Sequence, residues 1–228
     1  MIDTEGLIER LAEIREPARP LAPPWRRTAN WLAFAVPFIV LVVVVMSPRS
    51  DLIAKVGDAR FLIEQTGALL TALTAAVAAF AITVPGFERR VLLLPVIPAV
   101  AWLGTLTQGC LRDWIEFGAD GLSLQPDWSC FPSIVLVGSV PAVAIAIMLR
   151  RGAPLRPHAT TALGGLAAAG LGDFGLRFFH TQDASLMVVV WQVGTVAILS
   201  ALAAIPGRYL LSWQSSIGRV RRRIALND

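Results

Sequence analysis

Hydrophobic positions are collected into six long stretches without a charged residue. The stretches are residues 28–48, 65–87, 91–111, 128–149, 157–172 and 184–207. A helix needs about 20 residues to cover the roughly 30 Å of hydrocarbon in a bilayer, and all but the fifth stretch reach that length. The fifth reaches it only by continuing through Asp173 and Arg177. The pattern predicts an all-α membrane protein with six transmembrane helices.

Basic residues divide unequally among the connections between these stretches. Of the 20 lysine and arginine residues, 15 lie before the first stretch, after the last one, or in the second and fourth connections. Positively charged segments close to a span are retained on the cytoplasmic side. The amino and carboxyl termini are therefore predicted to be cytoplasmic, in a multi-pass protein of the bacterial inner (cytoplasmic) membrane.

This topology divides the chain into three predicted parts. Residues 1–29 carry a cytoplasmic amphipathic helix and a proline-rich spacer, residues 30–213 form the six-helix transmembrane domain, and residues 214–228 form a basic cytoplasmic tail. Hydrophobic residues make up 55% of the chain and charged residues 16%, which is too apolar for a soluble domain. The net charge of +4 follows from the topology. The tail is therefore predicted to contact membrane lipid, with no direct binding of nucleic acid.

A stripe of apolar residues near the amino end predicts one amphipathic helix outside the membrane. The stripe is Leu7, Ile8, Leu11 and Ile14, and the opposite face includes Glu9 and Glu13. Residues 3–16 hold five acidic residues and two arginines. A helix that lies on anionic lipid is basic, so this acidic helix fits better in a protein groove with a basic rim. The alternative is that it folds back on the connections around Arg89 or Arg150.

Both cysteines are predicted to lie on the periplasmic side. Cys110 ends the third stretch and Cys130 opens the fourth. Disulfides persist in the oxidising periplasm, whereas a pair with this long spacing and no nearby histidine is a poor zinc signature. Three alternatives remain open, namely a structural disulfide, a redox-sensing or metal-sensing pair, and two unpaired thiols.

Three charged residues are predicted at membrane depth: Glu64, Asp173 and Arg177. Such residues are functional candidates by default. Asp173 and Arg177 are four positions apart on one helix face, so they can pair with each other as a structural lock. Stripes of glycine and alanine in the same stretch favour close helix packing, within one chain or between two copies of a homo-oligomer.

Motifs of enzymes are missing from the sequence. It contains no nucleophile elbow, zinc-protease motif, phosphate-binding loop or dinucleotide fingerprint. His158 and His180 are predicted on opposite sides of the membrane, so they cannot share a site. We therefore expect a protein that is not an enzyme and has no cofactor or metal site.

Several motifs resemble one family of regulators. They are residues 150–157 (RRGAPLRP), the glycine- and alanine-rich residues 162–172, Trp191-Gln192, residues 207–213 (GRYLLSW), and the amino-terminal Leu7-Ile8, Leu11 and Trp25-Arg26-Arg27. Together they resemble the NrsF family of bacterial membrane anti-sigma factors. The resemblance is weakest over residues 50–126.

The resemblance implies that the cytoplasmic amino-terminal segment sequesters an extracytoplasmic-function sigma factor and releases it on a periplasmic or envelope stress signal. It also implies sensing by periplasmic cysteines, the first of which matches Cys130. The second follows a histidine in the family, whereas Thr181 follows His180 here, so Cys110 is the candidate partner. The alternative function is a small transporter or channel that uses Glu64, Asp173 and Arg177.

Overall fold

The structure, a computed structural model, describes residues 5–6, 21–84, 86–122, 124, 126–152, 154–181 and 183–211. This part of the chain is helical and contains no strand. The predicted partner-binding stripe and the basic tail lie outside it.

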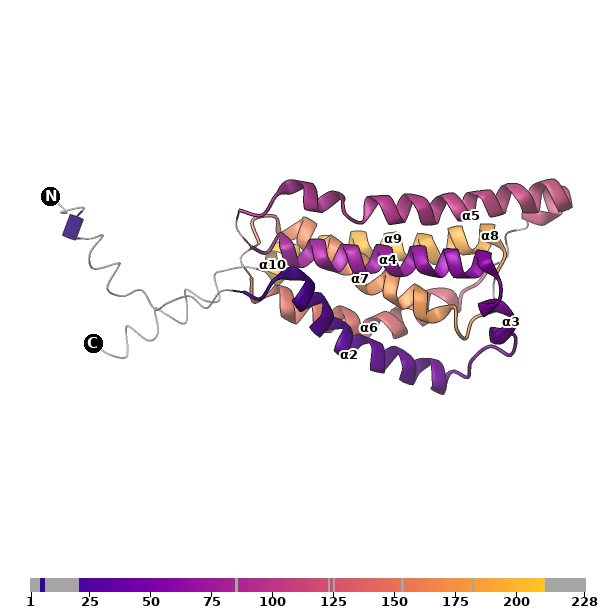
Figure 1. Ribbon diagram of the computed structural model, residues 1–228, viewed down its shortest axis with the longest axis horizontal. Helices are drawn as coiled ribbons and strands as arrows, with labels where there is room; N and C mark the ends of the chain where they lie inside the picture. The colour runs from indigo at the N-terminus through magenta and orange to yellow at the C-terminus, as the bar shows by residue number, and fades with distance from the viewer. Residues whose placement is uncertain are drawn as a thin grey trace.

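Six long helical segments run back and forth along one axis (Figure 1). They are α2 (Pro24–Val45), α4 (Ala59–Ala81), α5 (Val96–Phe117), α6 (Cys130–Leu149), α7 (Pro157–Leu176) and a last segment made of α8 (Ser185–Met187), the π-helical η3 (Val188–Val193) and α9 (Gly194–Ala204). Short helices fill the connections: α3 (Leu52–Val56), η1 (Arg89–Leu93), η2 (Gly118–Leu122) and α10 (Gly207–Leu210). The described chain begins and ends at the same end of the bundle.

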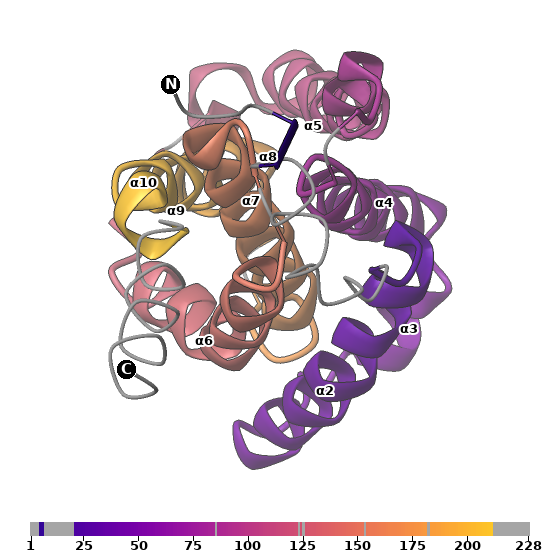
Figure 2. The same cartoon turned by 90° about the vertical axis from the view of Figure 1, so that its left-hand side faces the viewer.

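Five of these segments are long and apolar enough to cross a membrane, and α7 is not among them. The reason is its composition, because its glycines, Thr160, Thr161 and Asp173 lower its hydropathy. Twelve of the 20 residues of α7 are buried, since it packs against α4, α6 and α9 in the centre of the bundle (Figure 2). A central helix needs small residues for packing rather than large apolar ones facing lipid. The sixth span therefore stays a prediction.

Two close approaches explain the small residues of α7. A Cβ atom on Gly172 would lie 2.9 Å from the carbonyl oxygen of Ile134 on α6. A Cβ atom on Gly165 would lie 2.6 Å from Cβ of Ala203 on α9. At these two glycines, the backbone of α7 therefore lies close to α6 and α9.

The helix boundaries differ from the predicted stretches where charged residues belong to a helix, as at the ends of α4 and α5. Helix α4 begins at Ala59, six residues before the predicted stretch, because the Asp58 side chain caps it by accepting a hydrogen bond from the Arg60 backbone N–H. Helix α5 continues beyond the predicted stretch to Phe117 and ends at Gly118, whose φ is 63°. Charged residues that were assigned to connections therefore lie on helices.

Candidate functional site

Charged side chains from several segments contact one another at the end of the bundle where α3 lies, on the right of Figure 1. Here α3, the first turns of α4 and α6, the last turns of α5 and α7, and the segment before α8 meet. We call this group the charged end. It comprises Arg49, Asp51, Lys55, Arg60, Glu64, Asp113, Asp127, Arg177, His180, Asp183 and Ser185.

Arg49, four residues after the end of α2, is the centre of one half of the charged end. Its guanidinium donates to both carboxylate oxygens of Asp51, at 2.6 and 2.8 Å, and to both of Asp183, at 3.0 and 2.6 Å. It also donates to the backbone oxygen of His180 at 3.2 Å. The Arg49 side chain is 1% exposed, so these bonds replace its lost hydration. The hydrogen bonds that Arg49 donates to Asp51 and Asp183 raise the pKa of Arg49 despite its burial.

Asp183 also binds Lys55 at 2.8 Å and lies 3.6 Å from Arg177. Burial acts to raise the pKa of Asp183, but hydrogen bonds from Arg49 and Lys55, with the charge of Arg177, outweigh it and the pKa is lowered. Three cations thus hold this carboxylate in its charged form. It ties the chain after α7 to the end of α2 and to α3.

Glu64 is the centre of the other half. One of its oxygens accepts from Arg60 Nε at 3.0 Å, and the other accepts from Arg177 Nη2 at 3.0 Å. Arg60 also contacts the hydroxyl of Ser185, which donates to Asp113 at 2.8 Å. The chain of contacts joins α4, α5, α7 and α8. Because Glu64 is only 5% exposed, removing one partner would leave a costly uncompensated charge.

The prediction that Asp173 and Arg177 form an ion pair with each other is wrong. Their side chains form no ion pair in the described part of the chain, and Arg177 binds Glu64 and Asp183 instead. Asp173 lies one helical turn deeper, is 2% exposed, and its Oδ1 has no hydrogen-bond partner among the described residues. Spacing along one helix could not show that two carboxylates from other segments lie closer to the arginine.

A second cluster surrounds the start of α6. His180 Nε2 lies 2.7 Å from a carboxylate oxygen of Asp127, whose other oxygen accepts from the Ser129 hydroxyl at 2.6 Å. Burial acts to raise the pKa of Asp127, but the bonds from Ser129 and His180 outweigh it and the pKa is lowered. Trp128 and Trp191 pack edge to face at 5.6 Å between ring centroids. The motif Trp191-Gln192 lies in η3, and π-helical turns are frequent at functional positions.

Both cysteine thiols are free in the structure. Cys130 is buried against Ile134 and Leu176, whereas Cys110 is half-buried on α5. The disulfide and the sensor role of the pair stay predictions. Alkylation in denaturant without reductant, followed by mass spectrometry, distinguishes two free thiols from a bridge. No group of three metal-ligating side chains is formed among the described residues.

Sequence reasoning singled out Glu64 and Arg177 but missed Arg49, Lys55, Asp183 and the contact between Asp127 and His180. Arg49 and Lys55 entered only the count of basic residues, and Asp183 was not considered. The spacing of Arg60 and Glu64, four positions apart, was the one usable local signal. Arg49 and Asp183 are separated by 134 positions, so no local pattern could join them.

The described part of the chain is a helical bundle with five candidate membrane helices and a network of ion pairs at one end. The family model described as NrsF, negative regulator of sigma F, matches residues 11–213, so the chain belongs to the NrsF family. It is therefore a negative regulator of a sigma factor, as the resemblance implied. No curated protein and no solved structure matches the chain.

Proposed function

We propose that this protein is an inner-membrane anti-sigma factor that holds an extracytoplasmic-function sigma factor with residues 1–29 and releases it on a periplasmic or envelope stress signal. The observation that carries the proposal is that α2 connects the amino-terminal segment to the charged end. Its carboxyl end leads to Arg49 in the charged end. Its amino end begins at Pro24, within residues 1–29 and after the apolar stripe proposed to hold the sigma factor.

The amino end of α2 is fixed by polar contacts across the bundle. Arg27 donates to the backbone oxygens of Phe80 and Met148, at 3.3 and 2.8 Å, and to the Thr83 hydroxyl at 2.8 Å. Trp31 Nε1 donates to the backbone oxygen of Pro141 at 2.8 Å. A displacement of α2 would therefore change its contacts with α4 and α6 at its amino end, which follows residues 1–20 in the sequence.

The proposed mechanism is sequestration through the apolar stripe. Burying one large apolar side chain contributes roughly 1.5–3 kcal/mol, so the stripe of Leu7, Ile8, Leu11 and Ile14 can supply most of the affinity. The acidic residues Glu9 and Glu13 would steer association with a basic groove. A signal that turns a mostly held sigma factor into a mostly free one must change the binding free energy by about 5.5 kcal/mol. Breaking several ion pairs at the charged end is one source of such a change.

The test compares Leu11→Asp with Glu9→Gln in the full-length protein. We expect Leu11→Asp to abolish capture of the sigma factor in pull-downs and to relieve repression of a sigma-dependent reporter. Glu9→Gln should mainly slow association and reduce its salt dependence. Repression that survives Leu11→Asp at normal protein abundance would remove residues 4–16 from the proposed interface.

One observation favours the alternative function of a small transporter or channel. Asp173 is a buried acid with an oxygen that lacks a partner among the described residues, and acids at membrane depth are candidates for carrying a proton or a cation. Glu64 and Arg177, in contrast, are engaged in ion pairs that join helices. Loss of an ion flux in Asp173→Asn, with repression unchanged, would support the transporter.

A further inference from the structure

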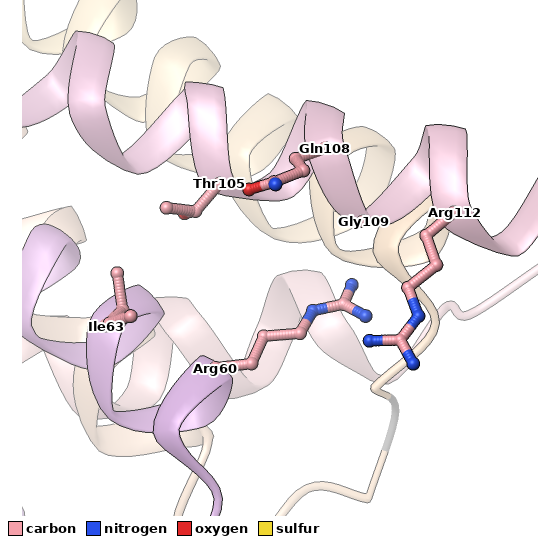
Figure 3. A pocket seen from close by; sticks show the side chains of 6 residues that line it. All are labelled: Arg60, Ile63, Thr105, Gln108, Gly109 and Arg112. Atoms are coloured by element: carbon pink, nitrogen blue, oxygen red, sulfur yellow. The ribbon is translucent and has the colours of Figure 1, made fainter.

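Two adjoining cavities lie in a groove between α4 and α5. Of the five candidate membrane helices, the one that contains α5 is the least buried. The first, of about 290 Å³, is lined by Arg60, Ile63, Thr105, Gln108, Gly109 and Arg112 (Figure 3). The second, of about 310 Å³, is mostly apolar and is lined by residues that include Leu62, Gly67, Leu70, Pro98, Ala101 and Trp102. Ile63 and Thr105 line both, so the cavities form one continuous groove with a polar and an apolar part.

The polar part offers hydrogen-bond donors from both helices. Arg60 reaches from α4 towards α5, where Arg112 extends beside the same space (Figure 3). Arg60 uses Nε for Glu64 and Nη2 for Ser185, and its Nη1 has no partner in the described part of the chain. Arg112 is 4.0 Å from Glu116, too long for a hydrogen bond, and its side chain is 76% exposed.

Arg60 and Arg112 bring two positive charges to the polar part, and three acids lie nearby: Glu64, Asp113, which accepts from the Ser185 hydroxyl, and Glu116, 4.0 Å from Arg112. Glu64 divides its two oxygens between Arg60 and Arg177, so it does not neutralise Arg60 alone. Two guanidinium groups directed at one space repel each other unless an anion lies between them. Gly109 leaves room for this arrangement, because a Cβ atom there would collide with Arg60 Nη2.

The depth of the groove matches one leaflet of a bilayer. Gln108 in the polar part and Pro98 in the apolar part are ten positions apart on α5, which corresponds to about 15 Å along a helix. Half of the hydrocarbon core is also about 15 Å thick. The polar part lies towards the charged end of the bundle, where headgroups would be, and the apolar part lies towards the middle.

We propose that this groove binds one anionic phospholipid, with its phosphate between Arg60 and Arg112 and an acyl chain against Ile63, Gly67 and Trp102. Because Arg60 also binds Glu64 and Ser185, a bound headgroup contacts the charged end directly. The composition of the membrane would thereby influence the charged end. This inference does not depend on how the sigma factor is held.

The first experiment titrates phosphatidylglycerol into the purified full-length protein in a neutral detergent and counts bound lipids by native mass spectrometry. Arg112→Gln removes one headgroup contact from an exposed side chain, so the fold should not change. We expect about fivefold weaker binding of the first lipid, which corresponds to about 1 kcal/mol. Arg90→Gln, an exposed arginine at the opposite end, is the matched control and should bind as the unchanged protein does.

The second experiment separates a lipid from a free anion. Ala101→Trp fills the apolar part of the groove, and its neighbour Val100→Trp, which lies outside it, is the control. We expect Ala101→Trp to weaken phosphatidylglycerol binding and Val100→Trp to leave it unchanged. Inorganic phosphate at the same concentration should fail to displace the lipid. Equal binding by all variants would overturn the lipid site, and displacement by phosphate alone would reduce it to an anion pocket.

Discussion

Arg49 and Asp183 form the contact on which the organisation of the charged end depends. The Arg49 side chain is 1% exposed and that of Asp183 is 26% exposed, so this ion pair is shielded from water on one side. Ion pairs on a protein surface contribute little, whereas removing one partner of a buried pair costs several kcal/mol. The same arginine also binds Asp51, which is 44% exposed and contributes less. The fixed geometry therefore comes mainly from Asp183.

The lowered pKa of Asp183 predicts how the stability of the fold depends on pH. A carboxylate with a lower pKa in the folded state stabilises that state above its unfolded pKa, which is about 3.9. The contribution is lost as the pH falls through the lower folded value. We expect Asp183→Asn to have a lower Tm than the unchanged protein at pH 7 and the difference to shrink in strong acid.

Thermal unfolding in detergent at pH 7, 5 and 3 provides the measurement. Asp120→Asn, on an exposed residue of η2, is the matched control and should unfold as the unchanged protein does. A difference between Asp183→Asn and the unchanged protein that is as large at pH 3 as at pH 7 would show that the carboxylate charge is not responsible.

Among the helices, α7 has the most stringent packing. At Gly172, an added Cβ would meet the backbone of α6, with the Ile134 oxygen at 2.9 Å and the Gly138 nitrogen at 3.1 Å. Backbone cannot rotate away as a side chain can, so two helices would have to separate. Overpacking of this kind costs about 1–3 kcal/mol.

Gly172→Ala should therefore lower the Tm of the bundle. Gly104→Ala on α5 is the control, because an added Cβ there meets nothing within 4 Å. Alanine favours a helix over glycine by about 1 kcal/mol, so the control should keep or raise the Tm. Equal effects of the two substitutions would mean that α6 and α7 do not pack as closely as the structure has them.

The sequence predicted the helices better than it predicted their contacts. Long apolar blocks are a strong local signal, and five of the six predicted stretches are confirmed as helices able to cross a membrane. The ends of α4 and α5 were misplaced because a charged residue can continue a helix beyond the hydrocarbon. The ion pairs could not be predicted from the sequence, because Arg177 binds Glu64, 113 positions away, and not Asp173 in the preceding turn. Only the fold decides which of several partners is nearest.

The molecule as a whole has different chemistry at its two ends. The charged end is a network of paired acids and bases, whereas the opposite end holds exposed arginines such as Arg89, Arg90 and Arg151. Arginines retained on one side of the membrane predict that this second end is cytoplasmic. The charged end would then be periplasmic and in reach of an envelope signal.

Labelling of single cysteines in intact cells checks this orientation. In a variant without Cys110 and Cys130, a membrane-impermeant reagent should modify a cysteine that replaces Asp120 and miss one that replaces Leu155. Both positions are exposed, so access depends on the side of the membrane. Gly152 is less suitable than Leu155, because a Cβ atom there would lie 2.4 Å from Cβ of Thr83. The reverse pattern of labelling would place the charged end in the cytoplasm.

If the charged end is the input of the regulator, breaking it should release the sigma factor without any change in residues 1–29. Arg49→Gln removes the ion pair with Asp183 and loosens the carboxyl end of α2, so we expect higher transcription from a sigma-dependent reporter. Asp120→Asn, on an exposed residue of η2 outside the ion pairs of the charged end, is the control and should leave repression intact. Protein abundance is followed by immunoblot, because an unfolded regulator would also raise transcription. Full repression by Arg49→Gln at normal abundance would mean that α2 does not carry the signal, while leaving the amino-terminal interface to be judged by Leu11→Asp.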